Sequence, residues 1–160
     1  FVLTETAVGF DGLLHFYSEF DWILDTLLSD LLAEYLEWPD TLPYPYAVKA
    51  SEQLAGFFSP EKFIRGITIS APGFYGPQGR KLRLEPFDSE MNRKLSGFTF
   101  RGKKICNYEM ESSALYGLSA LLGHKALTVC AVIGNRASGE FISDYKPLIR
   151  ELAMNVLQII

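Results

Sequence analysis

The strongest constraint on the fold lies in the second half of the chain, where two apolar runs flank an amphipathic segment. Residues 104–108 (KICNY) have strand character, and residues 112–122 carry apolar side chains at helical spacing. Residues 126–133 (ALTVCAVI) are apolar except for Thr128, which is typical of a strand covered on both faces. A strand, a helix and a second strand with short connections form a βαβ unit. The pattern therefore predicts an α/β fold with a mixed, mainly parallel sheet flanked by helices.

The rest of the chain follows the same two periodicities. Apolar and β-branched runs predict strands over residues 1–8 and 64–69. The further expected elements are helices over 18–38, 47–58, 89–95 and 145–160 and a short strand over 81–84. A domain rarely begins inside a strand, because the strand's hydrogen bonds need neighbours. We therefore interpret residues 1–160 as the C-terminal portion of a single domain, with a sheet that is incomplete on its N-terminal side.

The charge balance and the cysteines argue against several classes of protein. Lys and Arg number 15 against 19 Asp and Glu, with no basic run longer than a pair, so we expect no nucleic-acid partner. No apolar stretch reaches the ~18 residues of a membrane span, so we expect no membrane partner. Cys106 and Cys130 lie in apolar segments without a further Cys or His at metal-ligand spacing. They are interpreted as reduced thiols of a cytoplasmic protein without a metal site.

Three segments with unusual chemistry follow predicted strands. They are GFYGPQGR at 73–80, EMESS at 109–113 and IGNRAS at 133–138. Ligands of parallel sheets bind outside the carboxyl ends of the strands. We therefore expect these three segments to gather at one edge of the sheet.

The first segment has the residue types that read a planar ligand. The amide of Gln78 both donates and accepts, Arg80 adds a charge-assisted donor, and Phe74 offers an aromatic face. The alternative is a Gly/Pro turn whose arginine packs on the surface and whose aromatics fill the rim of the core. Residue types alone favour that structural alternative.

The second and third segments also have two interpretations. Glu109 and Glu111 stand where a strand gives way to a helix, so either carboxylate is expected to cap the helix, and residue types alone favour this role. A carboxylate at such a place also accepts two hydrogen bonds from a sugar diol. Arg136 is by default a surface salt bridge. His15 is expected to be a structural histidine, with a position facing a cleft as the alternative, and His124 is expected to be an exposed turn residue.

Four known catalytic motifs are missing from the sequence. It has no G-x-S-x-G and no ordered Ser/His/Asp set, and it has neither a P-loop nor an H-E-x-x-H zinc motif. The usual hydrolase, nucleotide-triphosphatase and zinc-protease interpretations therefore have no support.

Taken together, FYGPQGR, NYEMESSALYGL and ALTVCAVIGNR resemble the nucleoside phosphorylase family, and within it the uridine phosphorylases. The opening ETAVGFDGLLHFY is similar to the family's stretch after its central phosphate-site strand. The likeness covers almost the whole chain and is weakest over residues 17–50. Three motifs in the family's order are far more specific than any one of them.

The resemblance implies roles for individual residues. Phe74, Gln78 and Arg80 match the spacing of the family's uracil-reading segment, and the signature Glu-Met-Glu-Ser that binds ribose is present from Glu109. The implied substrate-binding set is Phe74, Gln78, Arg80, Glu109, Met110, Glu111, Ile133 and Arg136. Within that set, Arg80, Glu111 and Arg136 have implied catalytic roles. The family's purine enzymes carry Ser-Asp after the strand corresponding to 126–133, whereas Gly-Asn-Arg stands here and is similar to the pyrimidine branch.

The resemblance also implies the reaction and the partners. Phosphate, as co-substrate, attacks the anomeric carbon of uridine or a related pyrimidine nucleoside, giving the free base and ribose 1-phosphate. No metal or other cofactor is implied, and the family associates into homo-oligomers. The family's phosphate contacts precede the stretch that begins at Phe1, so the 160 residues alone are expected to recognise base and ribose without turning over. The alternatives are a hydrolytic nucleosidase of the same fold and a non-catalytic nucleoside-binding segment.

Overall fold

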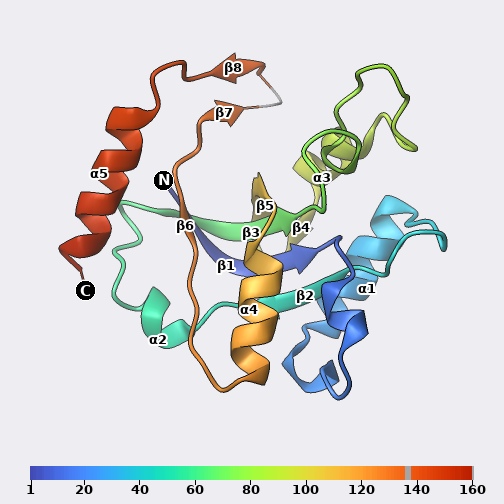
Figure 1. The fold of residues 1–160 in the computed structure, drawn as a ribbon, viewed down its shortest axis with the longest axis horizontal. Coiled ribbons are helices and arrows are strands. Elements are labelled where there is room, and N and C mark those ends of the chain that lie inside the picture. The colour runs from blue at the N-terminus through green and yellow to red at the C-terminus, as the bar shows by residue number, and fades with distance from the viewer. Residues whose placement is uncertain (136–137, 160) are drawn as a thin grey trace.

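A curled, mainly parallel sheet forms the centre of the computed structural model, which describes residues 1–135 and 138–159 (Figure 1). β1 (Val2–Gly9) pairs in parallel with β3 (Ile64–Ser70), and β3 pairs in parallel with β5 (Lys103–Glu109). The antiparallel strands are β2 (Tyr46–Lys49) and β6 (Val129–Cys130), both on β1, and β4 (Thr99–Phe100) on β5. This mixed sheet confirms the predicted fold class.

Helices cover both faces of the sheet. Their bounds are α1 (Thr26–Leu36), α2 (Glu52–Ala55), α3 (Met91–Gly97), α4 (Ser112–Leu121) and α5 (Lys146–Leu157). Short 3-10 turns occur at η1 (Leu13–Phe16), η2 (Asp21–Ile23) and η3 (Gly76–Gln78), and β7 (Gly134–Asn135) pairs with β8 (Glu140–Phe141). α4 packs on β1, β2 and β3 and crosses in front of the sheet in Figure 1, while α1 and α3 pack on β2 and β5 respectively.

The core is divided between the two faces of the sheet. Ala7 and Val8 are successive residues of β1 and are both fully buried, so their side chains point to opposite faces. Ala7 packs in a cluster with Leu14, Tyr46 and Tyr116 on the α4 side. Val8 belongs to a second cluster, formed largely with Phe10, Leu28, Leu32, Leu36, Ile67, Ile69, Met91, Leu95 and Phe98 from the α1 and α3 side.

The predicted helix over 18–38 is wrong in its first third. The chain there forms η2, Leu24 makes a β-bridge to Val48, and α1 begins only at Thr26. Asp25 fixes that start because its carboxylate accepts a hydrogen bond from the Leu28 N–H at 3.3 Å. The apolar residues of 18–25 pack in a 3-10 turn and a β-bridge, and their spacing alone does not distinguish this structure from a helix.

The predicted helix over 47–58 is also wrong in its first part. Residues 46–49 form β2, whose Tyr46, Ala47 and Val48 are buried and pair antiparallel with β1. Ser51 then caps α2 by accepting a hydrogen bond from the Leu54 N–H at 3.3 Å. The apolar run of Tyr46, Ala47 and Val48 is too short to distinguish a strand from a helix, and its pairing with β1 makes it a strand.

Two further strand predictions need correction, and the others agree. Residues 81–84 have no regular structure, and the strand predicted over 126–133 is reduced to Val129–Cys130, antiparallel to the beginning of β1. Because its pairing stops there, Val132 and Ile133 are exposed and the run is not covered on both faces. Helix α5 and strands β1, β3 and β5 lie where expected. Over the described residues, no helix is both long enough and apolar enough to cross a membrane.

Candidate functional site

The carboxyl ends of three strands meet at one edge of the sheet. In the register of the ladders, Gly9 of β1 faces Ser70 of β3, and Ser70 faces Glu109 of β5. The 73–80 loop and the 109–113 segment therefore emerge side by side, as predicted from the sequence. The 133–138 segment does not follow the same rule, because β6 is antiparallel to its neighbour.

Cys130 of β6 instead pairs with Val2, at the start of β1. Burial raises the pKa of the Cys130 thiol, and the negative charge of Glu109 adds to the effect. Ile133 is 45% exposed. Arg136 lies outside the described residues.

The 73–80 loop is built on a tight 3-10 turn. The carbonyl of Tyr75 accepts hydrogen bonds from the N–H of Gln78 at 3.0 Å and from the N–H of Arg80 at 2.9 Å. Gly79 adopts a left-handed backbone with φ 67°, which a residue with a Cβ takes only at a cost. The turn thus holds Phe74, Gln78 and Arg80 in one short loop, and their joint action on a single ligand stays a prediction.

Arg80 and Phe74 are in direct contact. The guanidinium carbon of Arg80 lies 3.6 Å from the centroid of the Phe74 ring, a cation–π geometry. Tyr75 packs edge-on against the same ring, with the ring centroids 5.4 Å apart. Both aromatic side chains are about half exposed, and Arg80 is partly buried.

Gln78 lies deeper than its neighbours. It is only 2% exposed, and its carbonyl accepts a hydrogen bond from Nδ2 of Asn92 on α3 at 3.3 Å. A Cβ on Gly79 would stand 2.6 Å from the same Asn92 nitrogen. Asn92 therefore positions the turn relative to α3. Nothing in the sequence indicated this role of Asn92.

Glu109 ends β5 with both carboxylate oxygens engaged by the protein. Oε1 accepts a hydrogen bond from the Ser70 hydroxyl, and Oε2 accepts from the N–H groups of Glu111 and Ser112, each at 2.8 Å. The capping role that residue types favoured is therefore present for Glu109. Glu111 itself occupies the N-cap position of α4 without a side-chain capping bond, and it is exposed next to the 38% exposed Met110.

A second carboxylate lies below this segment. Asp11, which follows β1, accepts hydrogen bonds from the Tyr46 hydroxyl and the Ser113 hydroxyl, both at 2.8 Å, and from the Leu13 N–H at 2.7 Å. Burial raises the pKa of Tyr46 well above its usual range. In the sequence, Asp11 stood out only as part of an Asp-Gly turn, and nothing marked Tyr46.

Part of the 73–80 loop lines a cavity of about 610 Å³. The other walls come from Phe10, Trp38, Met91 and Phe87, among others. Arg80, which contacts the Phe74 ring, also lines this cavity, whereas Gln78, Glu109 and Glu111 are not part of its lining.

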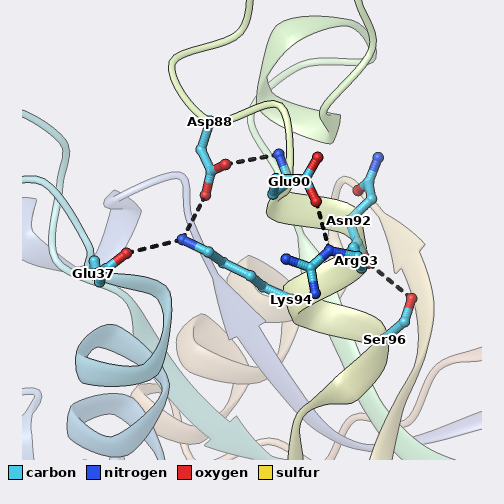
Figure 2. A network of polar contacts seen from close by, with 7 residues as sticks. All are labelled: Glu37, Asp88, Glu90, Asn92, Arg93, Lys94 and Ser96. Atoms are coloured by element: carbon cyan, nitrogen blue, oxygen red, sulfur yellow. Dashed lines mark hydrogen bonds and ion pairs between the residues drawn. The ribbon is translucent and has the colours of Figure 1, made fainter.

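Residues 82–88 line part of this cavity, and an ion pair between Asp88 and Lys94 of α3 holds the carboxyl end of this segment. Figure 2 shows Lys94 Nζ between Asp88 Oδ2, at 3.0 Å, and Glu37 Oε2 beyond the end of α1, at 3.1 Å. Burial works to raise the pKa of the Asp88 carboxyl, but the Glu90 N–H and the Lys94 ammonium hold it below its usual range. The segment 81–87, without regular structure, is thus fixed at its carboxyl end.

The two histidines differ in their surroundings, as expected. His15 places Nε2 2.9 Å from the Tyr44 carbonyl, and its ring packs edge-on against Phe20 and Tyr46. His124 is exposed in the turn after α4. Cys106 and Cys130 are free thiols.

Comparison with known proteins places this arrangement in a family. The family model described as the Phosphorylase superfamily matches residues 1–160. The chain belongs to the phosphorylase superfamily. The predicted resemblance to nucleoside phosphorylases of the uridine phosphorylase type is thereby confirmed at the level of the family.

Two curated relatives of the chain are named uridine phosphorylase. The protein from Thermococcus kodakarensis is 40% identical over 76 residues, which cover 48% of this chain and 27% of the relative. The protein from Haemophilus influenzae is 32% identical over 81 residues, which cover 49% of this chain and 31% of the relative. Each alignment thus spans less than a third of the relative's length.

Two solved structures have the same fold. The Trypanosoma brucei nucleoside phosphorylase, described as showing uridine phosphorylase activity, superposes with a TM-score of 0.77 at 21% identity, over 99% of this chain and 56% of that one. A uridine phosphorylase of Phytophthora capsici gives a TM-score of 0.52 at 17% identity, over 99% and 58%. The chain therefore spans little more than half of the chains on which it superposes.

Proposed function

We propose that the chain is the C-terminal portion of a uridine phosphorylase domain, which cleaves uridine or a related pyrimidine nucleoside with phosphate. The observation that carries the proposal is the register of Ser70 with Glu109 across β3 and β5. This register brings the Phe74–Arg80 loop and the Glu109–Glu111 segment to the same edge of the sheet. That arrangement supports the binding of the base and the sugar of a single nucleoside there. The names of the curated relatives support the same substrate.

In this proposal the base is held by the 73–80 loop. Uracil leaves with negative charge on its carbonyl oxygens, so the Arg80 guanidinium and the Gln78 amide bind it more strongly as the glycosidic bond breaks. Gln78 itself is buried, which reduces the reorganisation that accompanies this step. Phe74 supplies a face for the planar ring. Ile133 and Arg136 would complete the base end.

The sugar is held by the 109–113 segment. Glu111 accepts hydrogen bonds from the ribose hydroxyls, and Met110 packs beneath the sugar; both side chains are exposed at the edge. Orientation of the bound nucleoside then contributes the positional part of catalysis. Phosphate is the co-substrate, and its contacts come from the rest of the domain, so the 160 residues alone release no uracil. Neither a metal nor another cofactor takes part. The complete domain associates into a homo-oligomer.

The test is uracil release from uridine by the complete domain, with and without phosphate. Arg80→Ala is expected to lower kcat/KM about 100-fold or more, as for loss of one donor to a developing anion. The matched control is Arg83→Ala, which removes another arginine of the same cavity wall and is expected to change kcat/KM less than about twofold. Phosphate-independent release of free ribose would instead indicate a nucleosidase, and no release at all would indicate a non-catalytic nucleoside-binding protein.

A further inference from the structure

The carboxylate of Glu109 joins three elements at the site edge. Glu109 is the last residue of β5. Its carboxylate accepts hydrogen bonds from the Ser70 hydroxyl at the end of β3 and from the N–H groups of Glu111 and Ser112 at the start of α4. One of those N–H groups is that of Glu111. The backbone from which the Glu111 side chain extends is therefore set by the orientation of the Glu109 carboxylate.

Ser70 determines that orientation. Its side chain is fully buried, and its hydroxyl oxygen also accepts a hydrogen bond from the Ser113 N–H at 2.9 Å. With the Ser113 N–H as donor to it, the Ser70 hydroxyl has its own proton available for Glu109. The geometry leaves Oε2 facing the helix start and Oε1 facing the strand.

The same hydrogen-bonded chain continues into the core. The Ser113 hydroxyl donates to Asp11 at 2.8 Å, and Asp11 accepts from Tyr46 on β2 at 2.8 Å. Ser113 and Tyr46 are 0% and 1% exposed. Bulk water therefore has little access to replace Ser70 if its hydroxyl is removed, and the loss falls on Glu109.

We infer that Ser70 is a positioning residue for the sugar, acting through Glu109 on Glu111, and that it sets the preference for ribose over 2′-deoxyribose. The inference rests on the proposed function. Ribose offers Glu111 two neighbouring hydroxyls as donors, whereas 2′-deoxyribose offers one. A displaced Glu111 therefore loses more with uridine than with 2′-deoxyuridine.

The test compares kcat and KM for uridine and 2′-deoxyuridine in the complete domain. Ser70→Ala is expected to lower kcat/KM for uridine about 10-fold, the size of one hydrogen bond to a charged group, and to lower that for 2′-deoxyuridine about threefold or less. The matched control is Ser51→Ala, which removes the Ser51 capping bond of α2, away from this hydrogen-bonded chain, and is expected to keep the substrate ratio unchanged. Equal losses for the two substrates in Ser70→Ala would overturn the inference.

A second variant covers failure of Ser70→Ala to fold. Glu109→Gln retains the shape and one acceptor for the helix start but turns an amide N–H₂ toward Ser70, and the same change in substrate ratio is expected. An unchanged ratio in a folded Glu109→Gln protein would refute the inference. If the wild-type protein turns over neither nucleoside, the proposed function fails and the inference fails with it; activity in the wild type with no change of ratio in the variants removes only the inference.

Discussion

Gly79→Ala tests whether the 73–80 loop requires glycine for its backbone or for its contact with Asn92. The left-handed conformation, φ 67°, costs an alanine ~1–2 kcal/mol, partly offset by the lower entropy of the unfolded chain. In addition, the new Cβ would lie 2.6 Å from Nδ2 of Asn92. Relief of that overlap breaks the Asn92–Gln78 hydrogen bond, which contributes ~1 kcal/mol. We expect Gly79→Ala to lower the free energy of unfolding by ~2 kcal/mol in total.

Gly102→Ala is the matched control, because Gly102 has φ 76° and nothing within 4 Å of the new Cβ. It is expected to cost only the backbone part, ~1 kcal/mol. Urea unfolding of the complete domain, followed by tryptophan fluorescence, gives both values. Only Gly79→Ala should also raise KM for uridine, about fivefold if ~1 kcal/mol of base binding is lost. Equal stability losses in the two variants would refute the role assigned to Asn92, and so would an unchanged KM.

Three further predictions concern stability and reactivity. Tyr116→Phe removes a hydroxyl that donates to the Thr4 carbonyl and accepts from the Thr128 N–H, each at 2.8 Å, so urea unfolding should show a loss of ~1–3 kcal/mol; an unchanged midpoint would contradict this. Burial raises the pKa of the Cys106 thiol to about 11 and also raises that of Cys130, so at pH 8 both should react with an aromatic disulfide reagent far more slowly in the folded protein than in urea, unlike an exposed cysteine. The pKa of Asp88 is lowered in the folded state, so its stabilising contribution is complete above the unfolded value of about 3.9 and disappears as the pH falls through the folded pKa; the stability difference between wild type and Asp88→Asn should be constant from pH 5 to 8 and shrink in more acidic urea titrations.

The parallel core of the fold could be predicted because its sequence signals are strong. β3, β5 and α4 have the right periodicity, and turn residues bound them on both sides. The predictions that failed concern elements whose structure depends on pairing with another strand. Ala47 and Val48 suit helix and strand alike, and only pairing with β1 makes them a strand. Val132 and Ile133 have the composition of a covered strand but lie beyond the point where pairing stops.

The candidate site shows the same division. Family-like spacing singled out Phe74, Gln78 and Arg80, and the structure shows a direct contact between Arg80 and Phe74. Sequence spacing did not reveal that Arg80 lies over Phe74, because that contact depends on the conformation of the loop. It also did not reveal the hydrogen bond from Asn92 to Gln78, because that bond depends on how the loop packs on α3. Ser70 and Asp11 were missed for a related reason. Their importance lies in hydrogen bonds to residues 39 and 102 positions away in the chain, which no local pattern records.

The register of β3 against β5 restricts which length changes the protein tolerates. Adding or deleting one residue within 64–70 would move Ser70 off Glu109 and turn the following side chains to the opposite face of the sheet. The segment 81–87 has no ladder to preserve and is mostly exposed, so it can gain or lose residues between its anchors. Variation in length is therefore expected to concentrate in 81–87, where it reshapes the cavity wall, while the distance between the two substrate-facing segments stays fixed.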